Sequence, residues 1–339
     1  MTLDLDCPPT GNHQNPNKLT SSTPPAITPR PIIIDTDPGQ DDALAILAAI
    51  AAPELKILGI TAVAGNVPLD LTANNALKIC ELAGRPDIPV FAGRDRPLRR
   101  DLITAEQVHG TTGIDGADLP EPTTSLQPQN AVDWITEQLT KANEQEITIC
   151  PVGPMSNIAT VLEAYPTLSS KIREIVCMGG GFFVGGNTTP TAEFNVLVDP
   201  EAAQIVLHSG APVTMLPLDV THKALMAHHW ISKVRTLGTH CGIAAANMLE
   251  FYERFDMEKY GTSGGPLHDP NVIAYLLHPE MYKGRYCNVE IETISPLTTG
   301  MTVVDWWGVT DRPVNCYYIT EVDADGFYNL LLELLARLP

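Results

Sequence analysis

Short β-branched runs alternate with alanine- and leucine-rich segments along the chain from residue 31 to residue 216. The β-branched runs predict strands at residues 31–34, 57–63, 88–91, 147–152, 175–178 and 213–216. The segments between them predict helices at residues 42–52, 69–83, 130–143, 155–164 and 200–208. Such alternation is typical of an α/β fold with a mainly parallel sheet.

The alternation of strands and helices stops after residue 217, and residues 222–278 are rich in helical patterns. Extended segments and a last helix then follow at residues 286–294, 301–304, 314–322 and 324–338. Since no linker separates these parts, we expect one domain over residues 31–339, an open, mainly parallel sheet flanked by helices and carrying a helical cap. Residues 1–30 contain six prolines and no periodicity, which predicts a disordered tail.

The composition of the chain indicates which partners it can bind and in which cellular compartment it functions. A net charge of -19 disfavours nucleic acids and attracts cations. The seven cysteines are scattered, odd in number and without a C-x-x-C pair, which indicates a reducing, cytoplasmic location and argues against disulfide or zinc frameworks. The longest apolar stretch, residues 43–52, is too short to span a membrane, so no membrane partner is expected.

Polar and glycine-rich residues follow several of the predicted strands. They occur at residues 35–42, 65–66, 152–154 and 178–181. Ligands of open α/β sheets bind beyond the carboxyl ends of the strands. These residues therefore predict a site at one edge of the sheet.

Four carboxylates stand within eight residues directly after the first predicted strand, at Asp35, Asp37, Asp41 and Asp42. Crowded carboxylates repel one another unless a cation compensates them, and an all-oxygen site suits Ca²⁺ or Mg²⁺. Helix capping by Asp41 and a turn at Asp37 would explain only one or two of the four. An EF-hand is excluded, because Ile46 stands where its last, bidentate glutamate is needed.

Two later clusters allow both a structural and a functional interpretation. Glu193 and Asn195 would point the same way on an extended segment and, with Asn187, suit vicinal hydroxyls; a polar loop explains them equally well. Asp269 before a proline is a good helix start. With His268 beside it, the same position also suits a metal ligand next to an acid that titrates near neutrality.

From about residue 31 to the end, the chain resembles the inosine-uridine preferring nucleoside hydrolase family. The motifs that carry the resemblance occur in the family's order: D-T-D-P-G-x-D-D-A, G-N, H-G, V-G-P-x-S-N, M-G-G-G, N-x-x-P-x-A-E-F-N, H-D-P and V-V-D-W-W-G. The resemblance implies a Rossmann-like nucleoside hydrolase fold. It also implies calcium-dependent hydrolysis of the N-glycosidic bond of inosine, uridine or cytidine, which gives ribose and a free base.

The resemblance also implies roles for individual residues. Ca²⁺ would be held by Asp37, Asp42 in a bidentate manner, Asp269 and the backbone carbonyl of Val152, a position where the family often has threonine. Asp37 would be the general base on a water, and His268 would protonate the leaving base. The substrate would contact the remaining site residues, which are Asp41, Asn66, His109, Met178, Asn187, Glu193, Phe194, Asn195 and Tyr252.

Some features depart from the family or do not follow from it. Met178 and Asn187 stand one residue further apart than in the family. The aromatic residue over the base is open among Phe251, Tyr252, Phe255 and Tyr260, and spacing favours Tyr252. The presence of both His109 and His268 suggests the branch of the family that uses a histidine to protonate the leaving base. It argues against the purine-specific branch, which relies on stacked tryptophans. The resemblance also implies a homodimer or a homotetramer, and the sequence does not decide between them.

Two other hypotheses remain. A strand followed by D-x-D also occurs in magnesium-dependent phosphatases of the haloacid-dehalogenase type, although Pro38-Gly39 replaces the usual Gly-Thr pair. A non-catalytic binding relative would keep the motifs without activity. Release of ribose, release of phosphate, or binding alone distinguishes the three.

Overall fold

The computed structural model describes residues 28–260 and 264–339, apart from the side chains at 256, 257, 259 and 260. The predicted disordered tail therefore lies outside the described residues up to residue 27. The first strand begins one residue earlier than predicted, because Arg30 belongs to it and its side chain donates to Thr148 and Glu174.

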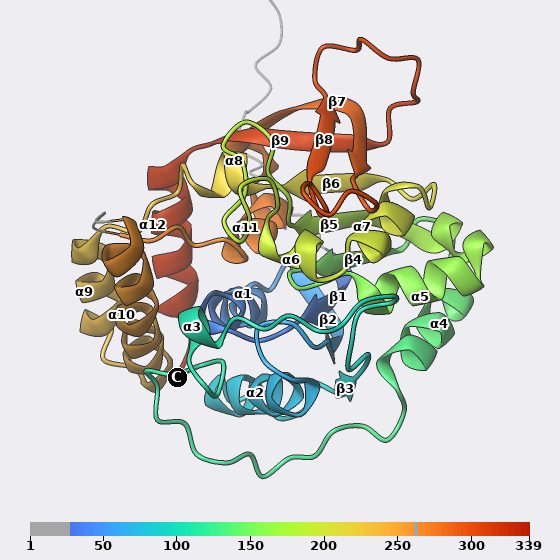
Figure 1. The fold of residues 1–339 in the computed structure, drawn as a ribbon. Coiled ribbons are helices and arrows are strands. Elements are labelled where there is room, and N and C mark those ends of the chain that lie inside the picture. Colours follow the sequence, from blue (N-terminus) through green and yellow to red (C-terminus); the bar gives the residue numbers. More distant parts are fainter. Residues whose placement is uncertain (1–27, 261–263) are drawn as a thin grey trace, which may run out of the picture.

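One nine-stranded sheet organises the described residues (Figure 1). Its order is β3-β2-β1-β4-β5-β6-β9-β7-β8. All pairs up to β6–β9 are parallel, whereas β9–β7 and β7–β8 are antiparallel. This confirms the predicted single-domain α/β fold with a mainly parallel sheet. The strands are β1 (Arg30–Thr36), β2 (Leu55–Ala62), β3 (Val90–Ala92), β4 (Ile147–Pro151), β5 (Ile172–Met178), β6 (Val213–Leu216), β7 (Tyr282–Ile291), β8 (Thr302–Asp305) and β9 (Cys316–Val322).

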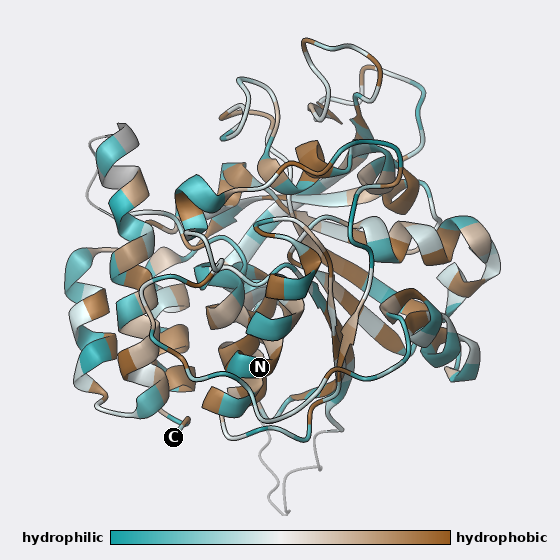
Figure 2. Ribbon diagram, turned by 60° about the horizontal axis from the view of Figure 1, so that its bottom comes forward, coloured by the Kyte–Doolittle hydropathy of each residue, from teal (hydrophilic) through white to brown (hydrophobic). Residues whose placement is uncertain are grey.

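Helices cover both faces of the sheet, and each face has its own hydrophobic cluster. One cluster contains α1 (Gln40–Ala51), α2 (Leu69–Leu82), α9 (His228–Thr236), α10 (His240–Tyr260), α11 (Pro270–Leu277) and α12 (Ala324–Leu335). The other contains α4 (Ala131–Lys141), α5 (Ser156–Ala164) and α7 (Pro200–Leu207). Figure 2 shows hydrophobic residues concentrated on the central strands. No helix among the described residues is long and apolar enough to cross a bilayer.

Short helices account for most differences from the predicted elements. These are α3 (Glu106–His109), α6 (Phe194–Val198), α8 (Leu218–Thr221) and the 3-10 turns η1 (Pro166–Lys171) and η2 (Pro279–Met281). One turn of helix is too short to show a periodic pattern. Side-chain caps help to stabilise such short helices. Glu193, before α6, accepts the backbone N–H groups of Asn195 and Val196.

The strand order reverses beside β1, which lies between β2 and β4. The chain builds β2 and β3 on one side of β1 and returns to place β4 on the other. In open α/β sheets this switch point leaves a crevice beyond the carboxyl ends of the two central strands. Asp37 follows β1 and Val152 follows β4, so residues far apart in the sequence meet there.

Candidate active site

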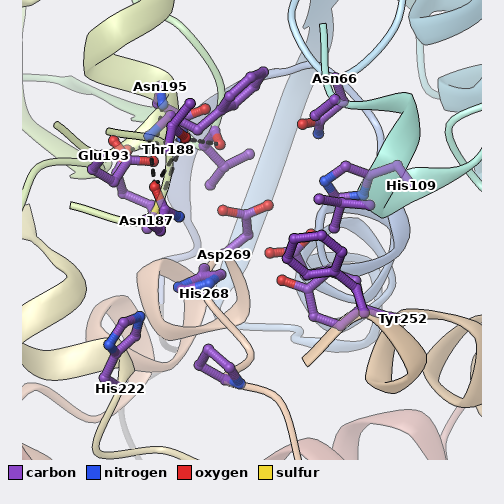
Figure 3. A pocket seen from close by; sticks show the side chains of 18 of the residues that line it. Asn66, His109, Asn187, Thr188, Glu193, Asn195, His222, Tyr252, His268 and Asp269 are labelled. Carbon is purple, nitrogen blue, oxygen red and sulfur yellow. Dashed lines mark hydrogen bonds between the residues drawn. The ribbon is translucent and has the colours of Figure 1, made fainter. Parts of the chain in front are cut away.

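A cavity of about 660 Å³ opens beyond the carboxyl ends of the parallel strands. Its volume lies in the range of small-molecule sites. Every predicted site residue lines it except Asp37 and Asp42, which are fully buried beside it. In Figure 3, Asn187, Glu193 and Asn195 lie on one side of the cavity, His109 and Tyr252 lie opposite, and Asp269 lies between them.

The Asp37 carboxylate is held between two backbone segments. Its Oδ2 accepts the Asn66 N–H at 2.7 Å, while its Oδ1 is buried without a hydrogen-bond partner among the described residues. A Cβ atom on Gly65 would lie 2.1 Å from Oδ2, and one on Gly153 would lie 2.2 Å from Oδ1. Only glycine permits this approach. A buried carboxylate oxygen with no partner fits a cation, because an unpaired buried charge is otherwise costly.

Three further acids converge from the N-terminal ends of two helices. Asp41 and Asp42 open α1, and Asp269 precedes α11. One carboxylate oxygen from each lies within 4.8 Å of the others. Asp42 is oriented by Thr36 Oγ1 and by the Gly39 N–H. These three acids could hold a metal ion, and they include Asp41, which the resemblance places among the substrate contacts.

Burial and mutual repulsion act together on these carboxylates. Burial, with repulsion from Asp42, raises the pKa of Asp41 from 3.8 to about 7. The same two causes raise the pKa of Asp37 well above its usual range, and burial with repulsion from Asp41 does so for Asp269. A hard cation bound by oxygens would remove both penalties.

Metal binding should consequently compete with protons. Folded Asp41 titrates near pH 7 rather than 3.8, so below pH 7 a cation must displace protons that the metal-free fold retains. We expect a divalent cation such as calcium to raise the melting temperature more at pH 8 than at pH 5. Melting curves of chelator-treated protein, with and without calcium, measure it. An equal gain at both pH values would contradict proton-linked binding at these acids.

Asp35, the remaining carboxylate of the sequence cluster, does not line the cavity. Its Oδ1 accepts hydrogen bonds from Thr61 and Asn157. Burial raises its pKa to about 7. Alternation along a strand would place these two positions on the same face, but β1 ends at Thr36, so Asp37 leaves the strand and turns into the site while Asp35 stays within the sheet. Asp35 therefore serves the packing of β1 against β2 and α5.

Three side chains of the predicted sugar-binding cluster form hydrogen bonds with backbone groups of the protein. Asn195 Nδ2 donates to the Val152 carbonyl at 2.9 Å, which leaves that oxygen one lone pair. Glu193 Oε1 accepts the Asn195 N–H and Oε2 accepts the Gly180 N–H, each at 2.9 Å. Glu193 is thus also the cap of α6. Asn187 Oδ1 accepts the Phe194 N–H at 3.1 Å.

The glycine loop after β5 depends on a residue that no motif indicated. Asp219 is buried in α8 and accepts the backbone N–H groups of Phe182 and Val184, each at 2.9 Å. It also accepts the Tyr318 hydroxyl. The loop in turn places Val184 and Asn187 at the cavity. Asp219 therefore fixes one wall of the site through the backbone.

Three histidines line the cavity, and the sequence indicated only two. His268 Nδ1 lies 2.8 Å from Thr221 Oγ1. His222, which no motif indicated, places its ring 5.8 Å from that of His268. Burial, with repulsion from His222, lowers the pKa of His268 well below its usual range, so the expectation that His268 titrates near neutrality is wrong for the ligand-free site. His222 follows α8 directly and lies in a region that the sequence presents only as helix-rich, whereas His268 stands in the H-D-P motif before α11.

The opposite wall carries His109 and aromatic residues. The ring centroids of His109 and Tyr252 lie 5.8 Å apart. Tyr252 and Phe255 line the cavity, and Phe251 does not; the Tyr260 side chain is outside the described residues. Burial lowers the pKa of His109 to about 3, so this histidine is neutral at physiological pH.

Comparisons with known proteins agree with this geometry. The family model described as inosine-uridine preferring nucleoside hydrolase matches residues 32–329. An uncharacterized protein of Schizosaccharomyces pombe is 50% identical over 308 residues, which cover 91% of this chain and 99% of the relative. The pyrimidine-specific ribonucleoside hydrolase RihA of Photobacterium profundum is 48% identical over 309 residues, which cover 91% and 99%.

Solved structures give the same result. A purine-preferring ribonucleoside hydrolase from Gardnerella vaginalis superposes with a TM-score of 0.85 at 32% identity, covering 91% of this chain and 98% of that one. The plant nucleoside hydrolase PpNRh1 superposes with a TM-score of 0.86 at 31% identity, covering 91% and 99%. None of these matches supports the phosphatase alternative.

Proposed function

Because this chain belongs to the inosine-uridine preferring nucleoside hydrolase family, whose members hydrolyse the N-glycosyl bond of ribonucleosides, we propose that it is a calcium-dependent hydrolase of uridine and cytidine that also accepts inosine. The pyrimidine preference is supported by similarity to relatives named pyrimidine-specific, at 48% identity. The calcium dependence is supported by the oxygen-only acidic site. His109 and His268, which face the same cavity, support the branch of the family that uses an acid histidine.

The buried acids at the switch point carry the proposal. Asp41, Asp42 and Asp269 offer oxygens within 4.8 Å of one another, and Asp37 adds a buried, unpartnered oxygen beside them. Carboxylates in this number suit a hard divalent ion, and calcium tolerates irregular oxygen sites better than magnesium does. The ligands we propose are Asp37, Asp42, Asp269 and the Val152 carbonyl. Asp41 contributes charge and contacts the substrate.

The amides of the site are oriented for hydroxyl groups. Asn66 Nδ2 donates to the Asp37 carbonyl at 3.0 Å and to Asp42 Oδ2 at 3.2 Å, so its Oδ1 turns toward the cavity (Figure 3). Asn195 Nδ2 donates to Val152, which likewise leaves Oδ1 as an acceptor. An amide oxygen accepts the hydrogen of a ribose hydroxyl. Asp41, Asn187 and Glu193 complete the ribose contacts we propose.

The mechanism assigns proton transfers to two residues. When bound, the cation would supply an acidified water and a charge that holds the 2′- and 3′-hydroxyls of ribose. Asp37 takes the proton of the attacking water, since a bound cation would offset the burial and repulsion that raise its pKa and would keep its carboxylate ionised. His268 gives a proton to the departing base, which requires the bound substrate to offset the burial that lowers the pKa of this histidine in the ligand-free site. The carboxylates around the sugar stabilise the electron-poor ribosyl group as the bond to the base breaks.

We also propose that residues 31–339 form the hydrolase domain, that residues 1–30 form a tail outside it, and that the enzyme is a cytoplasmic homodimer or homotetramer. Ile294, Leu297 and Val309 expose 82–89% of their surface. These apolar side chains stand in the loops before and after β8, and their exposure supports an association surface there.

A ribose-release panel tests the proposal. Uridine and cytidine should be hydrolysed fastest, inosine more slowly, and 2′-deoxyuridine with a kcat/KM lower by about 10⁴-fold, because polar groups built for the lost hydroxyl remain unpaired. A chelator should abolish the activity, and calcium should restore it. Release of phosphate from p-nitrophenyl phosphate, or nucleoside binding without ribose release, would contradict the proposal.

A further inference from the structure

Gln40 is a fully buried amide at the start of α1 that no step of the proposed reaction uses. Its Nε2 donates to the backbone carbonyl of His109 at 2.9 Å and to that of Asp115 at 3.1 Å. If the amide were turned over, its oxygen would face two carbonyl oxygens. Two acceptors therefore fix which end of the amide is nitrogen.

The orientation of this amide determines where His109 carries its proton. The remaining amide atom, Gln40 Oε1, lies 2.7 Å from His109 Nδ1. An amide oxygen can only accept, so Nδ1 has to carry the hydrogen. A neutral imidazole has a single N–H. Since burial keeps His109 neutral, Nε2 is left with a lone pair.

The unprotonated nitrogen, His109 Nε2, is on the side of the ring away from Gln40 and is available to the cavity. The His109 ring lines the cavity between Asn66 and Tyr252 (Figure 3). No group among the described residues hydrogen-bonds to Nε2. The ring also packs closely on Gly39, where a Cβ atom would lie 2.4 Å from Nδ1. The ring position is therefore set by Gly39, and its hydrogen-bonding polarity is set by Gln40.

We propose that Gln40 is a positioning residue that locks His109 in the tautomer protonated at Nδ1, so that the cavity presents Nε2 as an acceptor for an N–H or O–H group of the substrate. Uridine offers N3–H and cytidine offers its amino group, so one acceptor recognises both bases at the same edge. The ribose 5′-hydroxyl offers the same chemistry. The recognition part of this inference rests on the proposed function, whereas the tautomer does not.

Nitrogen NMR of the ligand-free enzyme tests the tautomer directly. In protein with ¹⁵N-labelled histidine, the His109 ring, assigned from its loss in His109→Phe, should show a protonated Nδ1 and an unprotonated Nε2. In Gln40→Met these resonances should move toward a mixture of the two tautomers. Asn75→Leu is the matched control. It removes an amide that likewise donates to two backbone carbonyls, those of Pro38 and Thr112, without touching His109, and should leave the resonances in place.

A wild-type His109 protonated at Nε2 would overturn the inference even if Gln40→Met failed to fold. So would resonances that Asn75→Leu and Gln40→Met change equally, because a general loosening of the loop would then be the cause. Nothing in this measurement requires turnover. An enzyme that released no ribose would sink the proposed function and leave the tautomer result intact.

Substrate analogues identify the donor. We expect wild-type kcat/KM to fall by about 10²-fold from uridine to 3-methyluridine, which lacks N3–H, and this ratio to shrink in Gln40→Met. If the ratio that shrinks is instead the one between uridine and 5′-deoxyuridine, the donor is the 5′-hydroxyl. Either result supports an acceptor at Nε2. Unchanged ratios for both analogues would show that Gln40 has no part in recognition.

Discussion

Replacing Asp37 with asparagine is expected to lower kcat for uridine by about 10³-fold or more. The amide has the size of the carboxylate, so it fits between Gly65 and Gly153, where a Cβ atom would already lie within 2.2 Å of Asp37. It cannot take a proton from water, and it removes one charge facing the cation. Initial rates of ribose release measure the loss, and calorimetry with calcium measures how much of it comes from weaker metal binding.

Asp35→Asn is the matched control for this substitution. Asp35 is as deeply buried, stands two positions earlier, and accepts hydrogen bonds at Oδ1 from a different pair of residues, Thr61 and Asn157. Burial raises its pKa to about 7, so the amide resembles the form that the fold already favours. Activity within a few-fold of wild type is expected. If Asp37→Asn were no slower than Asp35→Asn, the base would have to be sought elsewhere.

The contrast between these two acids shows how far a sequence can predict a site. The β-branched runs and their spacing predict the parallel sheet, since both reflect local periodicity that tertiary contacts then bury. The position of acids after the first strand predicts a site at the carboxyl edge. Spacing alone does not separate Asp35 from Asp37. That separation depends on where β1 ends and on which neighbours its last side chains meet.

Other features of the site arise from contacts between distant parts of the chain. Gln40 meets His109 across 69 positions, and Asp219 meets the glycine loop across 37. Neither residue stands in a pattern with its partner, so no local period reveals the contact. Glu193 illustrates a different difficulty: its motif position suggests ligand binding, yet its carboxylate also caps a helix of one turn.

Replacing His268 with alanine should slow uridine hydrolysis by about 10²–10⁴-fold and leave p-nitrophenyl riboside nearly unaffected. A pyrimidine is a poor leaving group as an anion, so its departure needs a proton. Nitrophenolate leaves without one. His268 lines the cavity with Nδ1 held by Thr221 at 2.8 Å, which turns Nε2 toward the substrate. Steady-state kinetics with both substrates measure the split.

Two neighbouring variants separate proton donation from packing. His222→Ala removes a ring 5.8 Å from that of His268, and with it a repulsion that lowers the pKa of His268, so it should not reproduce the selective loss of uridine hydrolysis expected for His268→Ala. Thr221→Val removes the hydroxyl that orients His268. It should slow uridine hydrolysis more than hydrolysis of p-nitrophenyl riboside, but by less than His268→Ala does. If His268→Ala slowed both substrates equally, the residue would be shaping the cavity, and the proton for the base would have to come from another group facing it.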